Sequence, residues 1–390
     1  MKKYPLLQAQ LGVFLECQSY PDSTQYSLPF DTEIDLQEDP QALAEAWKKL
    51  IKATAIFRNR FMIDENGTPL QWPDDDMKAE IPIREMSEAE AKEYINTSFV
   101  RPFNILDGSP LFRIEFIKTE EKLHMLTDFH HLIMDGFSYS YIFERTLGSV
   151  LKGKEKPVDL SFYETANEEQ EYFKTEEYAK ARDFFVNMLQ GEESSSLSSV
   201  ASAEGKLVVS SEAISKNKCD AWCDEHNVDA QSLFQAAFAV ALGRMTRSQL
   251  PVYCTSYHGR IGRSMMRSTG MFVNNVAMKT DLKPDETVIS LINAVRSNTA
   301  EAVSMGRYPF PHLNRELGIV PGVSFNYRPF KQYLKINGKK YPGTEIMRST
   351  AQTDINVHIE NINDDYVICV ESSDAVNSAE TVRMFAGAVY

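Results

Sequence analysis

The chain has 390 residues, of which 43% are hydrophobic and 25% are charged, and its net charge is −14 at pH 7. This length is too great for one compact core and predicts two domains. The acidic balance disfavours a general nucleic-acid binder, no apolar run approaches the roughly 20 residues that span a bilayer, and the start of the chain shows no signal peptide.

In the first half of the chain, helices and strands are expected in mixed order. Helices are predicted from apolar residues at helical spacing or from capping signals, over 37–53, 87–97 and 137–151. Ser87 and Glu90 have the spacing of a capping box, which supports the second helix. Strands are predicted over 57–63, 112–116 and 123–129. The last strand ends at His130.

The second half repeats this alternation. Helices are predicted over 211–226, 230–244, 287–305 and 378–390, and a charged helical segment over 168–189 precedes the boundary between the halves. Strands are predicted over 251–256, 272–280 and 322–327. Segments 354–360 and 366–372 are expected to form a hairpin that turns at Asn363-Asp364-Asp365. The two halves together predict an α/β fold with mixed sheets.

A Ser-rich stretch marks the expected boundary between the halves. Residues 192–202 read Glu-Glu-Ser-Ser-Ser-Leu-Ser-Ser-Val-Ala-Ser. Such a composition disfavours packing and indicates a linker or an exposed loop. We therefore expect an N-terminal lobe over 1–180 and a C-terminal lobe over 181–390.

The cysteines argue against a disulfide framework. There are five, Cys17, Cys219, Cys223, Cys254 and Cys369. An odd and scattered set fits a reducing compartment and predicts a cytoplasmic protein. Cys219, Cys223 and His226 fall at helical spacing, but a fourth ligand is missing nearby, so we predict an ordinary amphipathic helix and no metal.

The most informative run is His130-His131-Leu132-Ile133-Met134-Asp135-Gly136. An imidazole with a pKa near 6.5 can act as a base near neutral pH. A single histidine would more simply be a hydrogen-bonded core residue, but two histidines followed by Asp-Gly favour a functional site. Consecutive residues at a strand end point to opposite sides. We therefore expect His131 to face a cavity and His130 to brace the loop.

Asp135 is expected to support the loop rather than to orient the base directly. A buried carboxylate at this position would need a cationic partner. Arg260 is the first candidate for that partner, and Arg58 and Arg60 are the alternatives. Gly136 is expected to let the backbone turn tightly or approach a ligand closely.

A local run of arginines stands out in this acidic chain. Between 244 and 267 there is no Asp or Glu, and the arginines are Arg244, Arg247, Arg260, Arg263 and Arg267. The run is either a solvated region of loop and strand or a basic rim for a phosphate-bearing ligand. The chain contains no Gly-x-Ser-x-Gly elbow, phosphate-binding P-loop or His-Glu-x-x-His motif that would favour another chemistry.

Further segments resemble the motifs of one family. In chain order they are Pro5–Leu15 with Tyr20–Ser23, Ile56–Phe61, Thr269–Asn275, Arg307–Phe310 and Ser324–Tyr327. With His130–Gly136 between the second and third of them, these segments resemble the motifs of the condensation-domain superfamily of nonribosomal peptide synthetases, and they occur in the same order. This superfamily is related to chloramphenicol acetyltransferase. The resemblance runs nearly from end to end.

The resemblance implies a fold and a site. The expected fold is α/β, with two lobes like chloramphenicol acetyltransferase arranged as a V and the His motif at their junction, midway along a tunnel. His131 would be the working residue, with His130, Asp135 and Gly136 around it. The tunnel would be lined by Phe272, Asn274, Ser324 and Asn326.

The resemblance also implies substrates and partners. A donor acyl or peptidyl thioester and an acceptor aminoacyl thioester would each arrive on the phosphopantetheine arm of a carrier domain, and the acceptor amine would attack the donor carbonyl to form an amide. No cofactor or metal would be bound intrinsically. The partners would be the upstream and downstream carrier domains and an adjacent adenylation domain, with no nucleic acid and no membrane.

The expected role of His131 follows from the chemistry of the amine. An α-amine with a pKa near 8 is already about a tenth neutral at pH 7, so deprotonation alone gains little. Holding the amine beside the thioester gains more, because effective molarities reach about 10⁵ M or higher. We expect His131 to orient the amine and to accept its proton as the tetrahedral species forms.

The sequence also departs from the family pattern. Ala53-Thr54-Ala55 replaces the usual histidine-glutamate pair before the second motif, and His258-Gly259-Arg260 keeps only the Gly-Arg of the expected segment. These changes leave the subtype open. The chain stops inside a predicted helix, which suggests an excised domain, and Met1 suggests that the domain opens its parent protein.

Three other functions remain open at this point. A stand-alone acyltransferase would use acyl-coenzyme A and the same histidine. An epimerisation domain shares the His motif but needs another acid/base partner, for which we find no candidate. A non-catalytic docking module would only recruit carriers, although the intact His motif disfavours it.

Overall fold

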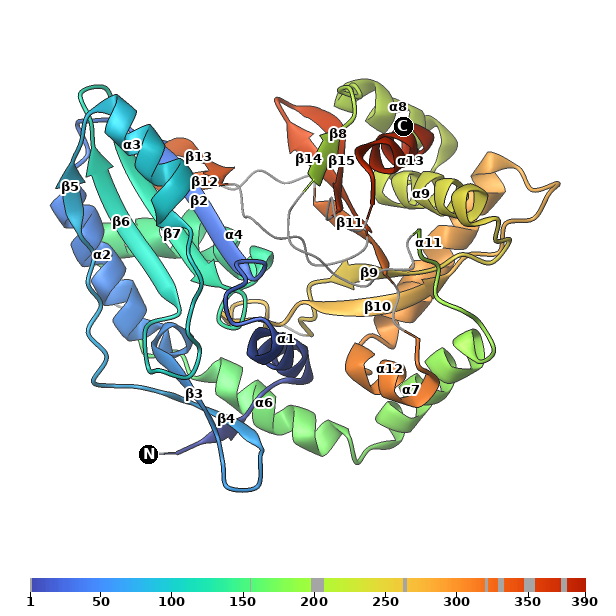
Figure 1. Ribbon diagram of the computed structural model, residues 1–390, viewed down its shortest axis with the longest axis horizontal. Helices are drawn as coiled ribbons and strands as arrows, with labels where there is room; N and C mark the ends of the chain where they lie inside the picture. Colours follow the sequence, from blue (N-terminus) through green and yellow to red (C-terminus); the bar gives the residue numbers. More distant parts are fainter. Residues whose placement is uncertain are drawn as a thin grey trace. The chain divides into compact units, whose positions relative to one another are not determined.

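The computed structural model describes residues 2–154, 156–197, 207–261, 265–319, 322–328, 333–346, 355–372 and 377–390. The chain forms two compact units, each built from segments that are distant in the sequence (Figure 1). Unit 1 comprises Met1–Tyr172, Arg260–Phe272 and Lys331–Arg348. Unit 2 comprises Phe173–Gly259, Val273–Phe330 and Ser349–Tyr390. The segment that contains Arg260 therefore belongs to the same unit as the His motif.

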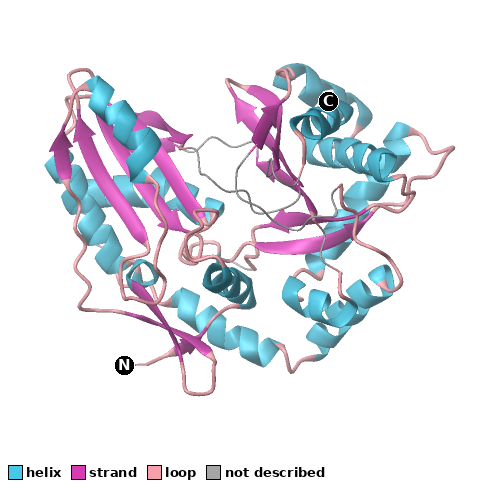
Figure 2. Cartoon of the chain, viewed as in Figure 1, coloured by secondary structure: helices cyan, strands magenta, loops and turns pink. Residues whose placement is uncertain are grey.

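Unit 1 combines two sheets with several helices (Figure 2). Its described strands are β1 (Tyr4–Pro5), β2 (Ser27–Ile34), β3 (Asn59–Ile63), β4 (Pro69–Pro73), β5 (Ile83–Glu85), β6 (Phe112–Lys118), β7 (Leu123–His130), β12 (Tyr333–Ile336) and β13 (Lys339–Glu345). Its described helices are α1 (Gln8–Ser19), α2 (Pro40–Ala53), the 3₁₀ helix η1 (Ala55–Arg58), α3 (Glu88–Tyr94), the π-helix η2 (Ile95–Phe99), α4 (Gly136–Tyr141), the π-helix η3 (Ile142–Leu147), α5 (Gly148–Leu151) and α6 (Ser161–Tyr172).

The larger sheet of unit 1 places the His motif at the end of an inner strand. Its strand order is β12-β13-β2-β7-β6-β5, and all pairs are antiparallel except β5 with β6. Every residue of β7 is buried. The strand is paired with β2 on one side and with β6 on the other. His130, the last residue of β7, is therefore fixed by a strand that is paired on both sides.

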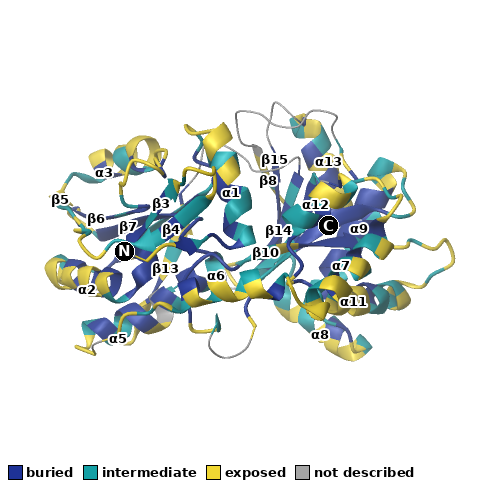
Figure 3. Ribbon diagram, turned by 90° about the horizontal axis from the view of Figure 1, so that it is seen from below, coloured by how far each residue is buried: buried dark blue, intermediate teal, exposed yellow. Residues whose placement is uncertain are grey.

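Helix α2 shows how the sequence pattern builds this core. Asp39 caps its N-terminus by accepting a hydrogen bond from the Gln41 N–H, and Pro40 occupies the first turn. Its buried face includes Trp47, whose indole N–H lies 3.4 Å from the Met125 sulfur on β7. The opposite face of α2 is exposed (Figure 3). Helix α2 thus covers one face of β7 and leaves its charged side in solvent.

Unit 2 is built around a second six-stranded sheet. Its described helices are α7 (Glu176–Leu189), α8 (Lys216–His226), α9 (Ala230–Thr246), α11 (Val288–Ser304), α12 (Phe310–Leu317) and α13 (Ala379–Val389). Its described strands are β8 (Leu207–Ser210), β9 (Val252–Tyr257), β10 (Asn274–Lys279), β11 (Val323–Arg328), β14 (Ile355–Ile362) and β15 (Asp365–Ser372). The strand order is β10-β9-β11-β14-β15-β8, with β11 parallel to both of its neighbours.

Most of the predicted elements are present, and the mixed α/β class is confirmed. The capping box of Ser87 and Glu90 forms. The predicted hairpin is the antiparallel pair β14–β15, and its turn has positive φ at Asn363 (53°) and Asp364 (66°). Two consecutive residues with positive φ are what a tight two-residue hairpin turn requires.

Several predicted boundaries differ from the structure. The helix predicted over 168–189 is two helices, α6 and α7, because residues 173–175 between them are not helical. Two further differences have local reasons. The helix predicted from 211 begins at Lys216, because the backbone of Ser211 and Ile214 still pairs with Ile368 and Tyr366 of β15. The strand predicted from 57 begins at Asn59, since Ala55–Arg58 form a 3₁₀ turn.

Several elements of unit 1 were not predicted, among them β1, β2, β4, β5, β12, β13 and α1. Strand β2 contains Pro29, which argues against a central strand in the sequence. Helix α1 has no side-chain cap at Leu7 to mark its start. Of the Ser-rich stretch, Glu192–Leu197 form neither helix nor strand, and the rest lies outside the described residues. Among the described residues, no helix has both the length and the apolar character needed to cross a bilayer.

Candidate active site

The His motif connects the end of β7 to the start of α4. The His130 N–H donates to the Leu111 carbonyl at 2.9 Å, and the His131 N–H donates to the Tyr26 carbonyl at 2.7 Å. At the other end, the Asp135 carboxylate accepts the Ser138 N–H at 2.8 Å and caps α4. The loop between the two histidines and the aspartate is therefore anchored at both ends by hydrogen bonds.

His130 is a buried, neutral imidazole. Its residue is 5% exposed, and burial, together with the nearby charges of His131 and Arg113, lowers its pKa to about 3. Its Nδ1 accepts the Leu132 N–H at 3.1 Å, so the proton must reside on Nε2. Nε2 faces the Cys17 sulfur at 3.5 Å. His130 is thus fixed in one tautomer and is unsuited to proton transfer near pH 7.

His131 lies in a different environment. It is partly exposed where its neighbour is buried, and its ring meets the ring of Tyr26 edge-on, with centroids 6.4 Å apart. The Tyr26 hydroxyl donates to the Glu16 carboxylate, which fixes the aromatic ring beside the two histidines. Of the two imidazoles, only His131 combines a fixed backbone with an accessible side chain.

Asp135 and Arg260 form a buried ion pair within unit 1. Arg260 Nη1 and Nη2 donate to the two carboxylate oxygens of Asp135 at 2.8 and 3.0 Å, and the side chains are 0% and 1% exposed. Burial alone would raise the pKa of Asp135. The charge of Arg260 and the hydrogen bonds to the carboxylate outweigh that effect and hold its pKa below the usual value.

A second layer of contacts encloses this pair. The Phe272 N–H donates to Asp135 at 2.9 Å, and the Arg260 guanidinium lies 4.6 Å from the Phe137 ring and 4.5 Å from the Phe272 ring. The Ser138 hydroxyl accepts from Arg260 and donates to the Gly270 carbonyl. The resulting cluster joins the start of α4 to the 260–272 segment.

The other two candidate arginines lie elsewhere. Arg58 pairs with Asp75, and Arg60 pairs with Asp74 at 3.1 Å. Both acids follow β4, so these pairs close the turn beside β3 and β4 and do not contact Asp135. Arg260 is the only one of the three that supports the His motif.

The glycines of the two motifs have different roles. Gly136 has no positive φ, and a Cβ added there would meet no atom within 4 Å, so the predicted tight turn at Gly136 is wrong. Its predicted close approach to a ligand stays a prediction. Gly270 has a φ of 153°, and a Cβ there would lie 2.1 Å from the Phe162 ring. Gly270 is thus required for packing, a signal that only the structure reveals.

Of the four predicted tunnel residues, Phe272 belongs to unit 1, and Asn274, Ser324 and Asn326 belong to unit 2. In unit 1, Phe272 is 4% exposed and packs against Phe162 with ring centroids 5.0 Å apart, so its observed contacts support the Asp135 cluster. In unit 2, the Asn274 amide donates to the Gly306 carbonyl at 3.0 Å, and the Ser324 hydroxyl donates to Asn356. Asn326, two residues further along β11, is partly exposed.

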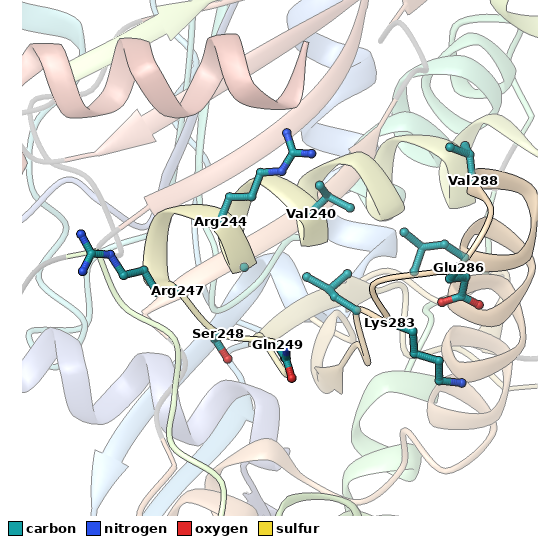
Figure 4. A pocket seen from close by; sticks show the side chains of 11 residues that line it. Val240, Arg244, Arg247, Ser248, Gln249, Lys283, Glu286 and Val288 are labelled. Atoms are coloured by element: carbon teal, nitrogen blue, oxygen red, sulfur yellow. The ribbon is translucent and has the colours of Figure 1, made fainter.

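The described arginines of the 244–267 run do not form one basic rim. Arg260 is buried with Asp135, and Arg263 lies outside the described residues. Arg244 and Arg247 line a pocket of about 480 Å³ at the end of α9, with Lys283 across from them. Figure 4 shows the charged ends of these three side chains pointing in different directions, so they do not converge on one phosphate group.

One group of described residues has the ligand types of a metal site. The ligand atoms of Asp31, Glu33 and His124 lie within 4.8 Å of one another. Asp31 and His124 are hydrogen-bonded at 2.9 Å, which raises the pKa of His124, and Glu33 pairs with Lys122. Each of these three side chains therefore already has a hydrogen-bond or ion-pair partner within the protein.

Comparison with known proteins decides the family. A family profile described as "Condensation domain" matches residues 1–389. This chain belongs to the condensation-domain family. The chain spans about a tenth of the length of the curated relatives that it matches. The chain is 30% identical to surfactin synthase subunit 1 of Bacillus subtilis (strain 168) over 82% of its own length and 9% of the relative's. It is 25% identical to bacitracin synthase 1 of Bacillus licheniformis over 97% of its length and 8% of the relative's.

Solved condensation domains have the same fold as this one. A variant of the starter condensation domain of rhizomide synthetase, in complex with C8-CoA, has a TM-score of 0.84 and 20% identity, covering 100% of this chain and 95% of that one. The condensation domain of the monacolin K polyketide synthase has a TM-score of 0.86 and 16% identity, covering 100% and 96%. At these identities the match concerns the fold.

Proposed function

We propose that this condensation domain forms an amide bond between a donor acyl or peptidyl thioester and an acceptor aminoacyl thioester, each bound to a carrier domain. The observation that carries the proposal is the contrast at the His motif. His130 is buried and neutral, whereas His131 is accessible on a loop anchored by the Asp135–Arg260 pair. This arrangement presents one imidazole, with a fixed backbone, to a substrate.

The proposed reaction needs no cofactor. The acceptor nitrogen attacks the donor carbonyl carbon, so that a C–N bond forms and the carbonyl oxygen becomes an oxyanion. His131 holds the amine in position and accepts a proton from its nitrogen. The C–S bond then breaks, and the leaving thiolate receives that proton, which restores neutral His131. Positioning is the larger contribution, because oriented reactants reach effective molarities of about 10⁵ M or more.

The relatives support the choice of substrates. The curated relatives are peptide synthetases such as surfactin, bacitracin and gramicidin S synthases. One solved relative holds C8-CoA and Leu-SNAC, which are an acyl thioester and an aminoacyl thioester. We therefore propose carrier domains as partners, an adenylation domain nearby, phosphopantetheine-linked substrates and a cytoplasmic location. Asn274, Ser324 and Asn326 are proposed to contact these substrates.

The test is a direct assay of amide formation. One carrier domain is loaded with an eight-carbon acyl group and a second with leucine, as the first members of a panel, and products are followed by intact-protein mass. Transfer of the acyl group onto the aminoacyl carrier is the expected result. Binding of loaded carriers without any transfer across the panel would contradict the proposal and support a docking module.

A stand-alone acyltransferase is the second candidate, because relatives have been solved with C8-CoA. The same assay separates the two. If the free eight-carbon acyl-coenzyme A reacts as fast as the carrier-bound donor at equal concentration, the acyltransferase function holds. Faster reaction of the carrier-bound donor supports the condensation domain.

A further inference from the structure

A network of buried polar side chains ends at the backbone of the His motif. Its members are Gln10 on α1, Gln71 on β4, Asn59 on β3 and Tyr163 on α6, and each is 1% exposed or less. Figure 1 shows these four elements close together in unit 1. Gln10 belongs to the opening family-like segment and Asn59 to the second, and neither segment has a role in the proposed chemistry.

The network forms a hydrogen bond with Leu132, the residue that follows His131. The Gln10 side-chain amide donates to the Leu132 carbonyl at 2.8 Å. The Leu132 N–H donates to His130 Nδ1 at 3.1 Å. Both peptide groups of Leu132 are therefore held, one by Gln10 and one by His130. His131 lies directly before this clamped residue, so its backbone has little freedom to move.

The hydrogen bonds of the two glutamines are complete. Gln10 and Gln71 exchange a reciprocal pair of amide bonds at 3.1 and 2.8 Å. Gln10 also accepts the Leu7 N–H, while Gln71 donates to the Pro5 carbonyl and accepts from Asn59. Every donor of the two side chains is used. A fully satisfied buried network is rigid, and the loss of one member leaves the others unpaired in a dry environment.

Helix α6 connects this network to the Asp135 cluster. The Tyr163 hydroxyl donates to the Asn59 side-chain oxygen at 2.9 Å. The preceding residue, Phe162, packs on Phe272 and directly over Gly270. Two neighbouring residues of α6 thus touch the two separate supports of the His motif.

From these contacts we infer that Gln10 is a positioning residue for His131. Through Leu132 it fixes the angle at which the His131 imidazole meets the substrate, and Gln71, Asn59 and Tyr163 hold Gln10 in place. The inference deepens the proposed function and rests on it where it concerns the reaction rate. The position of the imidazole itself can be tested without the reaction.

The test compares two equally buried glutamines. Gln10→Met keeps the length of the side chain but removes its amide. Gln235→Met is the matched control, since Gln235 is 0% exposed and its amide donates to Tyr253 at 3.2 Å and Thr299 at 3.0 Å in unit 2. Both variants lose a buried amide, but only the first one touches the His motif.

Two readouts are measured on each variant. The first is the rate of amide formation with loaded carriers at saturating substrate, expected to fall about 10- to 100-fold in Gln10→Met, as misplacement of a reacting group does, and by less than about 3-fold in Gln235→Met. The second is the NMR signal of the His131 imidazole in histidine-labelled protein, assigned by its loss in His131→Asn. It is expected to shift in Gln10→Met and to stay unchanged in the control.

The outcomes separate this inference from the proposed function. If the wild-type chain makes no amide, the proposed function fails, and the NMR signal still reports on positioning. An unchanged His131 signal in folded Gln10→Met overturns the inference, as does an equal rate loss in both variants. If Gln10→Met does not fold, Tyr163→Phe replaces it. That variant removes one hydroxyl from the network and is expected to shift the same signal, and no shift there also overturns the inference.

Discussion

The two ends of the His-motif loop are held by opposite kinds of interaction. At the His130–Leu132 end, every partner is neutral, namely an imidazole, amides and backbone groups. At the Asp135–Ser138 end, the support is a fully buried ion pair. A neutral network depends on the geometry of each hydrogen bond, whereas a buried charge depends on keeping its counter-charge. The two ends should therefore fail under different conditions.

The largest expected effect is at the charged end. Asp135→Asn leaves Arg260 charged, buried and without its counter-ion, and we expect the free energy of unfolding to fall by about 3–5 kcal/mol. The matched control is Asp75→Asn, which removes the partner of Arg58. Because the Asp75 side chain is 82% exposed, we expect a loss of at most about 1 kcal/mol. Urea denaturation measures the free energy of unfolding of both variants. Equal losses would show that the Asp135–Arg260 pair contributes no more to stability than an exposed ion pair does.

The neutral end should be sensitive to acid. The pKa of His130 is about 3 in the folded chain and near 6.5 when unfolded. Between these values the unfolded chain binds a proton that the folded chain excludes, so stability falls as the pH is lowered. Between pH 7 and pH 5, we expect His130 to lower the free energy of unfolding by about 2 kcal/mol.

The acid effect is measured as a difference between wild type and His130→Asn. The raised pKa of buried Asp128 acts in the opposite direction, because the folded chain then holds its proton more tightly. That contribution is largely shared by both proteins, so it cancels to first order in the difference. A pH dependence that is identical in the two proteins would mean that His130 is not held neutral.

The two glycines sharpen the comparison, and Gly136 is expected to give the smallest effect. Gly270→Ala places a Cβ 2.1 Å from a carbon of the Phe162 ring, and we expect a loss of about 1–3 kcal/mol in the free energy of unfolding. Gly136→Ala meets no neighbouring atom, and we expect a change within about 0.5 kcal/mol. If Gly136→Ala also reduces amide formation without changing stability, the space beside Gly136 belongs to the substrate. Equal destabilisation by both substitutions would contradict this division.

The sequence was informative where charge or periodicity decided the outcome. A buried Asp135 needed a cation, and Arg260 was the leading candidate. The capping box at Ser87 and the β14–β15 hairpin follow from local signals. The boundary near residue 180 stays a prediction, and so do the roles of the site residues in chemistry.

The remaining features depend on tertiary contacts that leave no local pattern. In the sequence Gln10 is an ordinary polar residue, because its contacts with Gln71 on β4 and with the Leu132 carbonyl form only in the folded chain. The same holds for Ser138 beside Arg260 and for Gly270 beneath Phe162. Strand β2 was missed because Pro29 disfavours a central strand, yet tertiary pairing with β7 places it there.

The most direct test of the account is the rate of amide formation by His131→Ala compared with wild type, using loaded carriers and intact-protein mass, with thermal unfolding measured alongside. Because the side chain is partly exposed and its backbone is held independently, we predict an unchanged unfolding temperature. The rate is predicted to fall by about 10² to 10⁴, the usual contribution of a positioned base. A folded His131→Ala variant that forms product at the wild-type rate would contradict the account.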